Sequence, residues 1–288
     1  MLTRRDTLAL GSAASFLALL PARLLAAPAE RLKPAVAVIE KRVAGRLGVA
    51  VLDTATGQVD GHRADERFAM CSTFKFLAAA HVLGRADKGA EDLSRRIDIP
   101  SAPLIAHSPV TGSRAGRTMN VLALCEAAMT ISDNTAANLL LDSFGGPAGL
   151  TAWLRSLGDG VTRLDRTEPD LNEAAPGDPR DTTSPAAMTA TMRRLLLGDV
   201  LTPDSRARLT GWLIGNQTGS KRIRAGLPGV WRVGDKTGSG ANGATNDIAI
   251  LWPPGRAPLL VAVYLTETTA PAAARDAVHA DVARLIGQ

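Results

Sequence analysis

The sequence predicts an α+β fold, because segments with strand character stand at both ends of the chain and enclose a helical middle. Residues 46–70 predict a hairpin, in which an apolar run precedes a Thr-Gly turn and a weaker second strand. Three more strands follow one another closely at 229–240, 245–253 and 257–267, and connections this short favour antiparallel pairing. The simplest arrangement is one five-stranded antiparallel sheet flanked by N- and C-terminal helices, with the helical middle as an all-α lobe and a cleft between the two.

The segments between the two strand regions show the apolar spacing of helices. A helix over 72–89 begins at Ser72, since serine is favoured at the N-cap or in the first turn. Residues 161–183 have three prolines, many charges and little periodicity, which predicts a long structured loop of a kind that often carries function. The other predicted helices cover 118–131, 134–144, 147–158, 184–198 and 271–287.

The chain of 288 residues is long enough for one large domain or two closely packed lobes. Residues 1–27 stand apart as a secretory signal, with a basic start, an apolar run too short to span a bilayer comfortably, and small residues near the cleavage point. Arg4 and Arg5 resemble the pair of a twin-arginine signal, with an ordinary Sec signal or an uncut anchor as the alternatives. The expected lobes are an α/β lobe of 28–70 with 215–288 and an all-α lobe of 71–214.

The composition is that of an ordinary globular protein, with 45% apolar residues, 21% charged residues and a formal net charge of +5. The basic residues are scattered and do not alternate with aromatic residues, so nucleic-acid binding is not expected. The four histidines lie far apart and show no metal-ligand spacing, so neither a metal nor another cofactor is expected. Cys71 and Cys125, in an exported protein, would ordinarily suggest a disulfide.

Two polar motifs stand where helices are predicted to begin. In STFK, Ser72 and Lys75 share a helix face, so the ammonium could meet and activate the hydroxyl as a nucleophile. The helix N-terminus would add backbone N–H groups that stabilise an oxyanion. An S-x-x-K spacing alone, however, is expected by chance in a chain of this length. In SDN, residues 132–134 lie between two helices, where ordinary capping is the simpler explanation.

A third motif, KTG, lies on a predicted strand. Strand alternation places Thr237 and Ser239 on one face, where they could hold the carboxylate of a ligand, and Lys236 on the other. The same stretch contains GSGANG, which matches the G-x-G-x-x-G fingerprint of a dinucleotide-binding loop. That fingerprint requires a helix after it, whereas a strand is predicted here. The glycines more plausibly let a substrate lie close to the backbone.

A fourth motif, EPDLN, lies in the long loop. Glu168 and Asn172 could hold one water between them, as general base and water holder, although a merely charged loop would look the same. Together, S-x-x-K, S-D-N, E-x-x-x-N and K-T-G in this order resemble the motif set of class A β-lactamases and their penicillin-binding relatives. The resemblance covers nearly the whole chain after the signal. Residues 163–181 resemble the omega loop of this family, and 222–240 resemble its catalytic strand and the approach to it.

The resemblance implies a serine β-lactamase, which hydrolyses the amide bond of penicillins and cephalosporins through an acyl-enzyme and confers resistance to them. It assigns the nucleophile to Ser72, which Lys75 activates either directly or together with Glu168 acting through water. Ser132 would pass a proton to the departing lactam nitrogen. Lys236 would lie beside Ser132 and supply positive charge.

The same resemblance assigns the binding residues. The backbone N–H groups of Ser72 and Ser239 would form the oxyanion hole. Asn134 would hold the side-chain amide of the substrate, and Asn172 would help to hold the deacylating water. Thr237 and Ser239 would face the carboxylate of the substrate.

An arginine usually supports this carboxylate site in the family. Arg222 is the favoured candidate, and Arg275 is the alternative. His107 falls where the family often has an aromatic residue at the mouth of the cleft, which implies a contact at the edge of the substrate rather than catalysis. In the omega loop, the Glu168–Pro169 bond resembles the cis peptide of the family.

The resemblance also bears on an ion pair and on the cysteines. Arg166 and Asp181 resemble the pair that closes the omega loop. Some relatives form a disulfide between the positions of Cys71 and Gly240, and others form one between the positions of Cys125 and Ala79. Neither partner is a cysteine here, so two free, buried thiols are expected.

Three other functions share some of these sequence features. A penicillin-binding D,D-peptidase shares the first three motifs but normally lacks the water site of Glu168 and Asn172. A non-hydrolytic β-lactam sensor would be acylated and stop, and would usually be attached to a membrane or signalling segment. The nucleotide-binding interpretation depends on the glycine pattern alone. We expect a periplasmic or secreted monomer that acts on a small-molecule β-lactam, with no nucleic acid partner and no membrane contact after removal of the signal.

Overall fold

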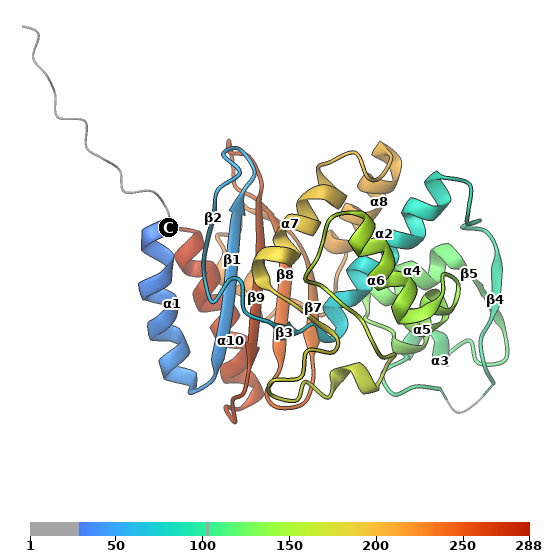
Figure 1. Cartoon of the computed structure of the whole chain (residues 1–288), viewed down its shortest axis with the longest axis horizontal. Coiled ribbons are helices and arrows are strands. Elements are labelled where there is room, and N and C mark those ends of the chain that lie inside the picture. The colour runs from blue at the N-terminus through green and yellow to red at the C-terminus, as the bar shows by residue number, and fades with distance from the viewer. Residues whose placement is uncertain (1–28, 102–103) are drawn as a thin grey trace, which may run out of the picture.

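The computed structural model describes residues 29–101 and 104–288, so the predicted signal at 1–27 lies outside the described residues. An antiparallel sheet of five strands has the order β2-β1-β9-β8-β7, which leaves β2 and β7 at its edges. The predicted α+β class and the sheet with its flanking helices are confirmed (Figure 1). The strands are β1 (Arg46–Asp53), β2 (Val59–His62), β7 (Arg232–Ser239), β8 (Thr245–Trp252) and β9 (Leu259–Thr266).

The central strand β9 shows how the sheet separates two hydrophobic cores. All eight of its residues are buried, because both faces of the sheet are covered. Helices α1 (Ala29–Val43) and α10 (Ala272–Ile286) lie together over one face, and the helical layer lies over the other (Figure 1). Alternate side chains enter the two cores: Leu259, Val261, Val263 and Leu265 on the side of α1 and α10, and Leu260, Ala262 and Tyr264 on the side of the helical layer.

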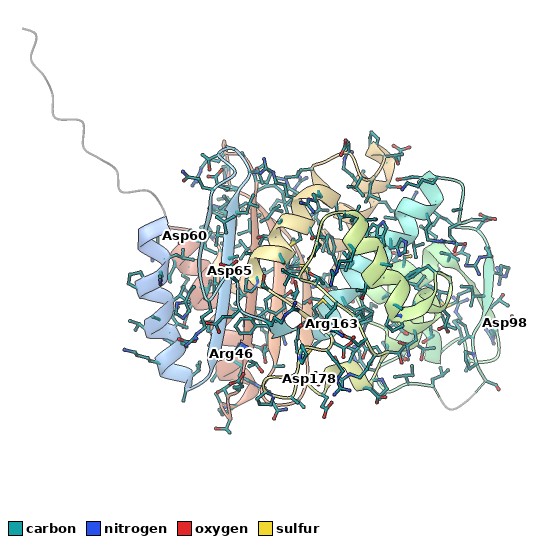
Figure 2. The ribbon with its side chains drawn as sticks, viewed as in Figure 1. Arg46, Asp60, Asp65, Asp98, Arg163 and Asp178 are labelled. Atoms are coloured by element: carbon teal, nitrogen blue, oxygen red, sulfur yellow. The ribbon has the colours of Figure 1, made fainter. Side chains whose placement is uncertain are left out.

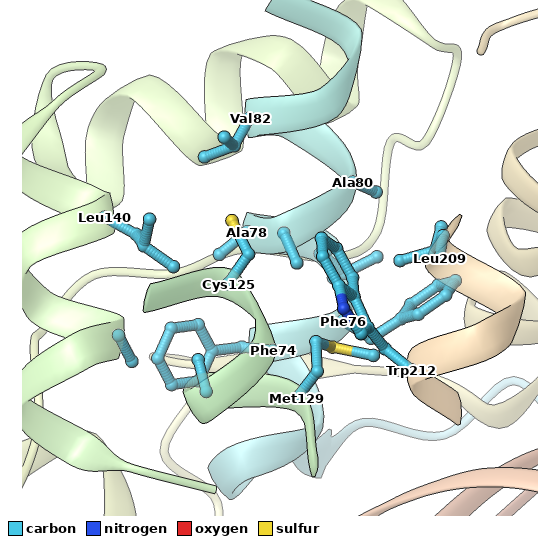
Figure 3. Packing of buried hydrophobic residues seen from close by; sticks show 14 of the residues in the cluster. Phe74, Phe76, Ala78, Ala80, Val82, Cys125, Met129, Leu140, Leu209 and Trp212 are labelled. Atoms are coloured by element: carbon cyan, nitrogen blue, oxygen red, sulfur yellow. The ribbon is translucent and has the colours of Figure 1, made fainter. Parts of the chain in front are cut away.

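Helix α2 (Phe74–Asp87) runs through the centre of the helical layer, and every residue from Phe74 to Gly84 is buried. A helix buried on all sides has no polar face, which explains its apolar composition. In Figure 3, Phe76 packs beside Met129 and Trp212, and Cys125 lies near Ala78. The surrounding helices are α4 (Val121–Thr130), α5 (Asn134–Asp142), α6 (Gly146–Ser156) and α8 (Pro203–Ile214). This packing fixes the end of α2 at which the predicted nucleophile stands.

One helix was missed by the sequence prediction, and another begins later than predicted. Helix α8 was not predicted, because its buried apolar side chains are only Leu209, Trp212 and Leu213, although Thr202 caps it and Pro203 stands in its first turn. The helix predicted from 118 begins three residues later, because the Asn120 side chain accepts a hydrogen bond from the N–H of residue 123 and caps the helix.

Several short elements and one further helix complete the described chain. Helix α7 (Pro185–Leu196) packs on β1 and β9. None of the helices in the described ranges combines the length and the apolar character needed to cross a membrane. The short elements are β3 (Phe68–Ala69) paired with β6 (Thr182–Thr183), β4 (Arg96–Asp98) paired with β5 (Thr118–Asn120), α3 (Pro109–Gly112) and α9 (Ile223–Gly226).

His81, in the middle of α2, is enclosed by aromatic rings. The Trp153 ring stacks on it with centroids 4.5 Å apart and an interplanar angle of 10°, and the Phe144 ring also lies at 4.5 Å. His81 Nδ1 has no hydrogen-bond partner among the described residues. Burial lowers the pKa of His81 to about 4, and the positive charges of Arg85 and Lys88 act in the same direction.

We therefore expect the free energy of unfolding to fall as the pH drops from 6.5 toward about 4, because the unfolded chain binds a proton at His81 and the folded chain does not. His279, whose pKa burial lowers to about 3, adds to this fall. The variant His81→Phe should flatten the pH dependence in part, since a ring of similar shape cannot titrate. Urea unfolding at a series of pH values tests this, and equal pH dependence for parent and variant would contradict it.

Candidate active site

The predicted nucleophile, Ser72, lies in a 3-10 turn, Cys71–Thr73, that leads directly into α2. The residue before it, Cys71, has a φ of 45°, in the left-handed region that non-glycine residues seldom adopt. Hydrogen bonds hold the turn on both sides: Met70 N donates to Asp181 O at 2.8 Å, and the hydroxyl of the last turn residue donates to Met70 O at 2.8 Å. The turn therefore presents Ser72 in a fixed direction.

Lys75 is fully buried, one helical turn after Ser72, and its ammonium is surrounded by oxygen atoms. Burial lowers the pKa of Lys75, and the charge of Glu168 opposes that shift. Ser72 Oγ is also 3.3 Å from Glu168 Oε1, so the hydroxyl contacts both members of the ion pair. The distances from Lys75 Nζ are 3.0 Å to Ser72 Oγ, 2.8 Å to Ser132 O, 2.5 Å to Asn134 Oδ1 and 2.9 Å to Glu168 Oε1.

The S-D-N turn divides between capping and the site. Asp133 caps α5 and also accepts hydrogen bonds from the backbone of α3, so the capping interpretation is correct for this residue. Ser132 has a φ of 63° and stands between the two buried lysines. Its hydroxyl oxygen is 3.3 Å from Lys75 Nζ and 3.0 Å from Lys236 Nζ. The turn thus joins the helical layer to the edge of the sheet.

The segment 163–181 crosses between the sheet and the helical layer, where Figure 2 shows Arg163 and Asp178. Its predicted closing ion pair is confirmed, because Arg166 Nε lies 2.6 Å from Asp181 Oδ2. The carboxylate of Asp181 is fully buried and also accepts the N–H of Arg166 at 2.9 Å. The two ends of the loop are therefore tied to each other.

Glu168 is held at the centre of this loop by two asparagines. The side chain of Asn138 in α5 clamps its backbone, accepting from Glu168 N at 2.9 Å and donating to Glu168 O at 2.9 Å. Asn172 Nδ2 donates to Glu168 Oε2, while Asn172 Oδ1 is buried without a hydrogen-bond partner among the described residues. The predicted cis bond between Glu168 and Pro169 is confirmed.

Strand β7 supplies the second buried lysine. Lys236 is fully buried and its Nζ donates to Ser132 Oγ at 3.0 Å and to Thr237 O at 2.8 Å. Burial, together with the charge of Lys75, lowers the pKa of Lys236 well below its ordinary value. The Thr237 hydroxyl contacts the hydroxyl of Thr218, which lies outside the predicted motifs.

Arg222, the favoured candidate for the arginine of a carboxylate site, reaches the end of β7. Its Nη2 donates to Ser239 Oγ at 2.8 Å and its Nη1 donates to Gly238 O at 2.9 Å and Asn246 O at 2.7 Å. On the opposite side, Arg222 Nε pairs with Asp276 Oδ1 at 2.8 Å. The guanidinium is therefore fixed by partners on two strands and on α10.

The other two predicted binding residues lie differently. His107 is exposed beside the S-D-N turn, where its backbone O accepts from Asn134 N at 3.0 Å and its Nε2 lies 3.2 Å from Ile131 O. Arg275 lies in α10, and the structure gives no hydrogen bond from its side chain to a described residue of the site. Of the two arginines, the structure brings Arg222 to the motifs.

Sequence reasoning missed several residues that shape the site. Asn138 stands four residues after Asn134 on α5, so the i, i+4 spacing of two asparagines on one helix face was a usable signal. Thr218, Asn246 and Asp276 had no such signal, because their partners are distant in sequence.

A match to the β-lactamase enzyme family extends over residues 30–288. The chain belongs to this family. It is 52% identical over 250 residues to β-lactamase L2 of Stenotrophomonas maltophilia, which covers 86% of this chain and 82% of L2. It is 50% identical over 262 residues to β-lactamase CTX-M-8 of Citrobacter amalonaticus, covering 91% of this chain and 90% of CTX-M-8. The solved structure of an ancestral class A β-lactamase, GNCA, matches with a TM-score of 0.87 and 65% identity, over 88% of this chain and 98% of that one.

The resemblance drawn from the four motifs is therefore confirmed, and the enzyme is a class A β-lactamase, a hydrolase of β-lactams. The nucleotide-binding alternative is wrong, since strand β8 rather than a helix follows the glycines of β7.

Both cysteines of this β-lactamase are free and buried, as predicted. The position facing the thiol of Cys71 is Gly240, where an added Cβ would lie 2.7 Å from Cys71 Sγ. Burial raises the pKa of Cys71 to about 12 and also raises the pKa of Cys125. Neither thiol is therefore available as a thiolate near neutral pH.

We expect a thiol reagent to find no reactive thiol in the folded enzyme and two per chain after denaturation without reductant. The reason is that burial withholds both sulfur atoms from the reagent and from each other. Absence of free thiols in the denatured, unreduced enzyme would show a disulfide and contradict the structure.

Proposed function

We propose that this β-lactamase acylates Ser72 with the opened lactam and hydrolyses the acyl-enzyme with a water held by Glu168 and Asn172. One observation carries the proposal: the Ser72 hydroxyl contacts both halves of a buried ion pair, with Lys75 Nζ at 3.0 Å and Glu168 Oε1 at 3.3 Å. A serine hydroxyl needs an adjacent base or cation to become a nucleophile, and here it has both.

In the acylation step, the Lys75–Glu168 pair takes up the hydroxyl proton as Ser72 Oγ attacks the lactam carbonyl. The backbone N–H groups of Ser72 and Ser239 receive the developing oxyanion. The close packing of β7 against the nucleophile turn supports this hole, since an added Cβ at Gly238 would lie 3.1 Å from Ser72 N.

As the lactam C–N bond breaks, the nitrogen needs a proton. Ser132 is the donor that we propose, because its hydroxyl contacts the ammonium groups of both lysines. A proton lost from Ser132 is replaced from Lys75, while the positive charge of Lys236 stabilises the carboxylate end of the substrate.

Deacylation needs a water activated next to the ester of Ser72. Glu168 Oε1 lies beside Ser72 Oγ and Glu168 Oε2 accepts from Asn172. Asn172 Oδ1 remains an acceptor without a protein partner among the described residues, so it can accept a hydrogen bond from that water. One hydrogen of the water is then hydrogen-bonded to Asn172, and Glu168 removes the other proton as general base.

Substrate recognition follows from the walls of the cleft. Asn134 presents its amide to the acylamino side chain, and His107 borders the same side. The hydroxyls of Thr237 and Ser239 bind the substrate carboxylate, and Arg222 adds the charge that a carboxylate requires.

The paired water-holding groups favour hydrolysis over the two related alternatives. A D,D-peptidase or a β-lactam sensor needs the nucleophile, but does not need the clamped Glu168 with Asn172 beside it. We further propose export through the signal at 1–27, action as a monomer outside the cytoplasm, and an omega-loop role for 163–181 in holding the deacylating water.

Replacing the carboxylate tests the deacylation role. Glu168→Ala should accumulate acyl-enzyme and lose about 10²- to 10⁴-fold in turnover, because the water loses its base. Turnover of a chromogenic cephalosporin and intact mass measure the two effects. Glu126→Ala, which removes an exposed carboxylate on α4, should turn over like the parent. A single stoichiometric burst from the parent would instead indicate a sensor or a peptidase.

Replacing each candidate arginine tests the carboxylate site. Arg222→Ala should lower kcat/KM by about 10- to 100-fold, the cost of one charge-assisted hydrogen bond to the substrate. Arg275→Ala should stay within about twofold of the parent, because the structure gives its side chain no hydrogen bond to a described residue of the site. Steady-state kinetics with one penicillin and one cephalosporin measure both variants. A larger loss for Arg275→Ala would reverse the assignment.

A further inference from the structure

Asn246, on β8, lies beneath the nucleophile turn and is only 1% exposed. Its single Nδ2 donates to two successive backbone carbonyls, Ala69 O at 2.9 Å and Met70 O at 3.0 Å. These carbonyls belong to the two residues before Cys71. The Asn246 side chain is therefore hydrogen-bonded to the backbone immediately before the turn that carries Ser72.

These two hydrogen bonds hold a strained segment of the backbone. Cys71 is in the left-handed region, a conformation that costs energy for a residue with a side chain and persists only when its surroundings impose it. Strand β7 presses on the same turn, since an added Cβ at Gly238 would lie 2.8 Å from Met70 O. Without the donors of Asn246, Ala69 O and Met70 O would lose their bonds to β8, and Met70 O would keep only its bonds from Thr73 within the turn.

The backbone of Asn246 serves a second group. Its carbonyl oxygen accepts a hydrogen bond from Arg222 Nη1 at 2.7 Å. Asn246 also pairs with Gly238 in the register of β7 and β8. Asn246 thus contacts both the backbone that precedes Ser72 and the Arg222 side chain.

We propose that Asn246 is a positioning residue for acylation, which sets the place of the Ser72 hydroxyl and amide relative to the carboxylate anchor at Arg222. This inference rests on the proposed acyl-enzyme mechanism. An asparagine suits the task because one amide nitrogen offers two N–H donors to two adjacent carbonyls. A serine has one donor and a leucine has none.

The two contacts make separable predictions. In Asn246→Ala, the side-chain donors are lost but the backbone carbonyl that holds Arg222 remains. The acylation rate constant should therefore fall by about 10- to 100-fold, as expected for a misplaced nucleophile. The non-covalent affinity for substrate should stay within about threefold of the parent, because the carboxylate anchor is intact.

Single-turnover stopped flow with a chromogenic cephalosporin and excess enzyme separates these quantities. Ring opening then reports acylation alone, and its dependence on enzyme concentration gives the limiting rate and the half-saturating concentration. Active-site titration with an irreversible acylating β-lactam corrects both for any unfolded fraction. Leu251→Ala is the matched control, since it truncates a fully buried residue of the same strand that packs in the core on the side of α1 and α10. It should lower the melting temperature and leave the limiting rate per active site unchanged.

A limiting rate for Asn246→Ala within threefold of the parent, or an equal loss in Leu251→Ala, would overturn the proposal. If Asn246→Ala yields no folded enzyme, Asn246→Ser, which keeps one donor, should show the same loss in a smaller degree. The proposed mechanism is judged separately, by whether the parent forms an acyl-enzyme and Glu168→Ala accumulates it.

Discussion

The structure depends most on the burial of three charges in one small volume. Lys75 and Lys236 are fully buried and Glu168 is 3% exposed, so each has lost nearly all contact with water. A buried charge is tolerated only when it is paired and hydrogen-bonded. Three parts of the fold must therefore meet at this point: α2 with the S-D-N turn, the loop 163–181 and β7. These partners converge where the helical layer adjoins β7.

The same requirement explains why strained backbone surrounds the site. Cys71, Ser132 and His107 all have positive φ values, and all three border or belong to the segments that supply partners to the lysines. Such conformations persist where surrounding contacts over-determine them. Asp133 shows how this is done at the S-D-N turn, because its carboxylate holds the backbone of both α3 and α5. The strain at Ser132 is thus balanced by the hydrogen bonds of its neighbour Asp133.

Residue spacing predicted the local parts of the site, and the family resemblance predicted distant partners within its motifs, such as Lys236 beside Ser132. The distant contacts outside those motifs were missed. Ser72 and Lys75 are a turn apart on one helix, so spacing alone placed them together. Asn246 is 176 residues away from Met70 and Arg222 is 54 residues away from Asp276, and no periodicity links such pairs. The strands were predicted well because long apolar runs with short connections leave few other arrangements. Helix α8 was missed because few of its side chains are buried, which weakens the apolar pattern.

The glycines of KTGSGANG show how a sequence fingerprint can arise from different contacts. An added Cβ at Gly238 would press on the amide of Ser72, and one at Gly240 would press on the thiol of Cys71, so neither position has room for a side chain. Gly243 instead has a φ of 74°, which the turn between β7 and β8 requires. A dinucleotide-binding loop uses glycines so that the backbone can approach a pyrophosphate. Here the backbone of β7 approaches the turn that carries Ser72. A glycine pattern shared with nucleotide-binding proteins therefore indicates that a backbone lies close to something, but it does not identify what.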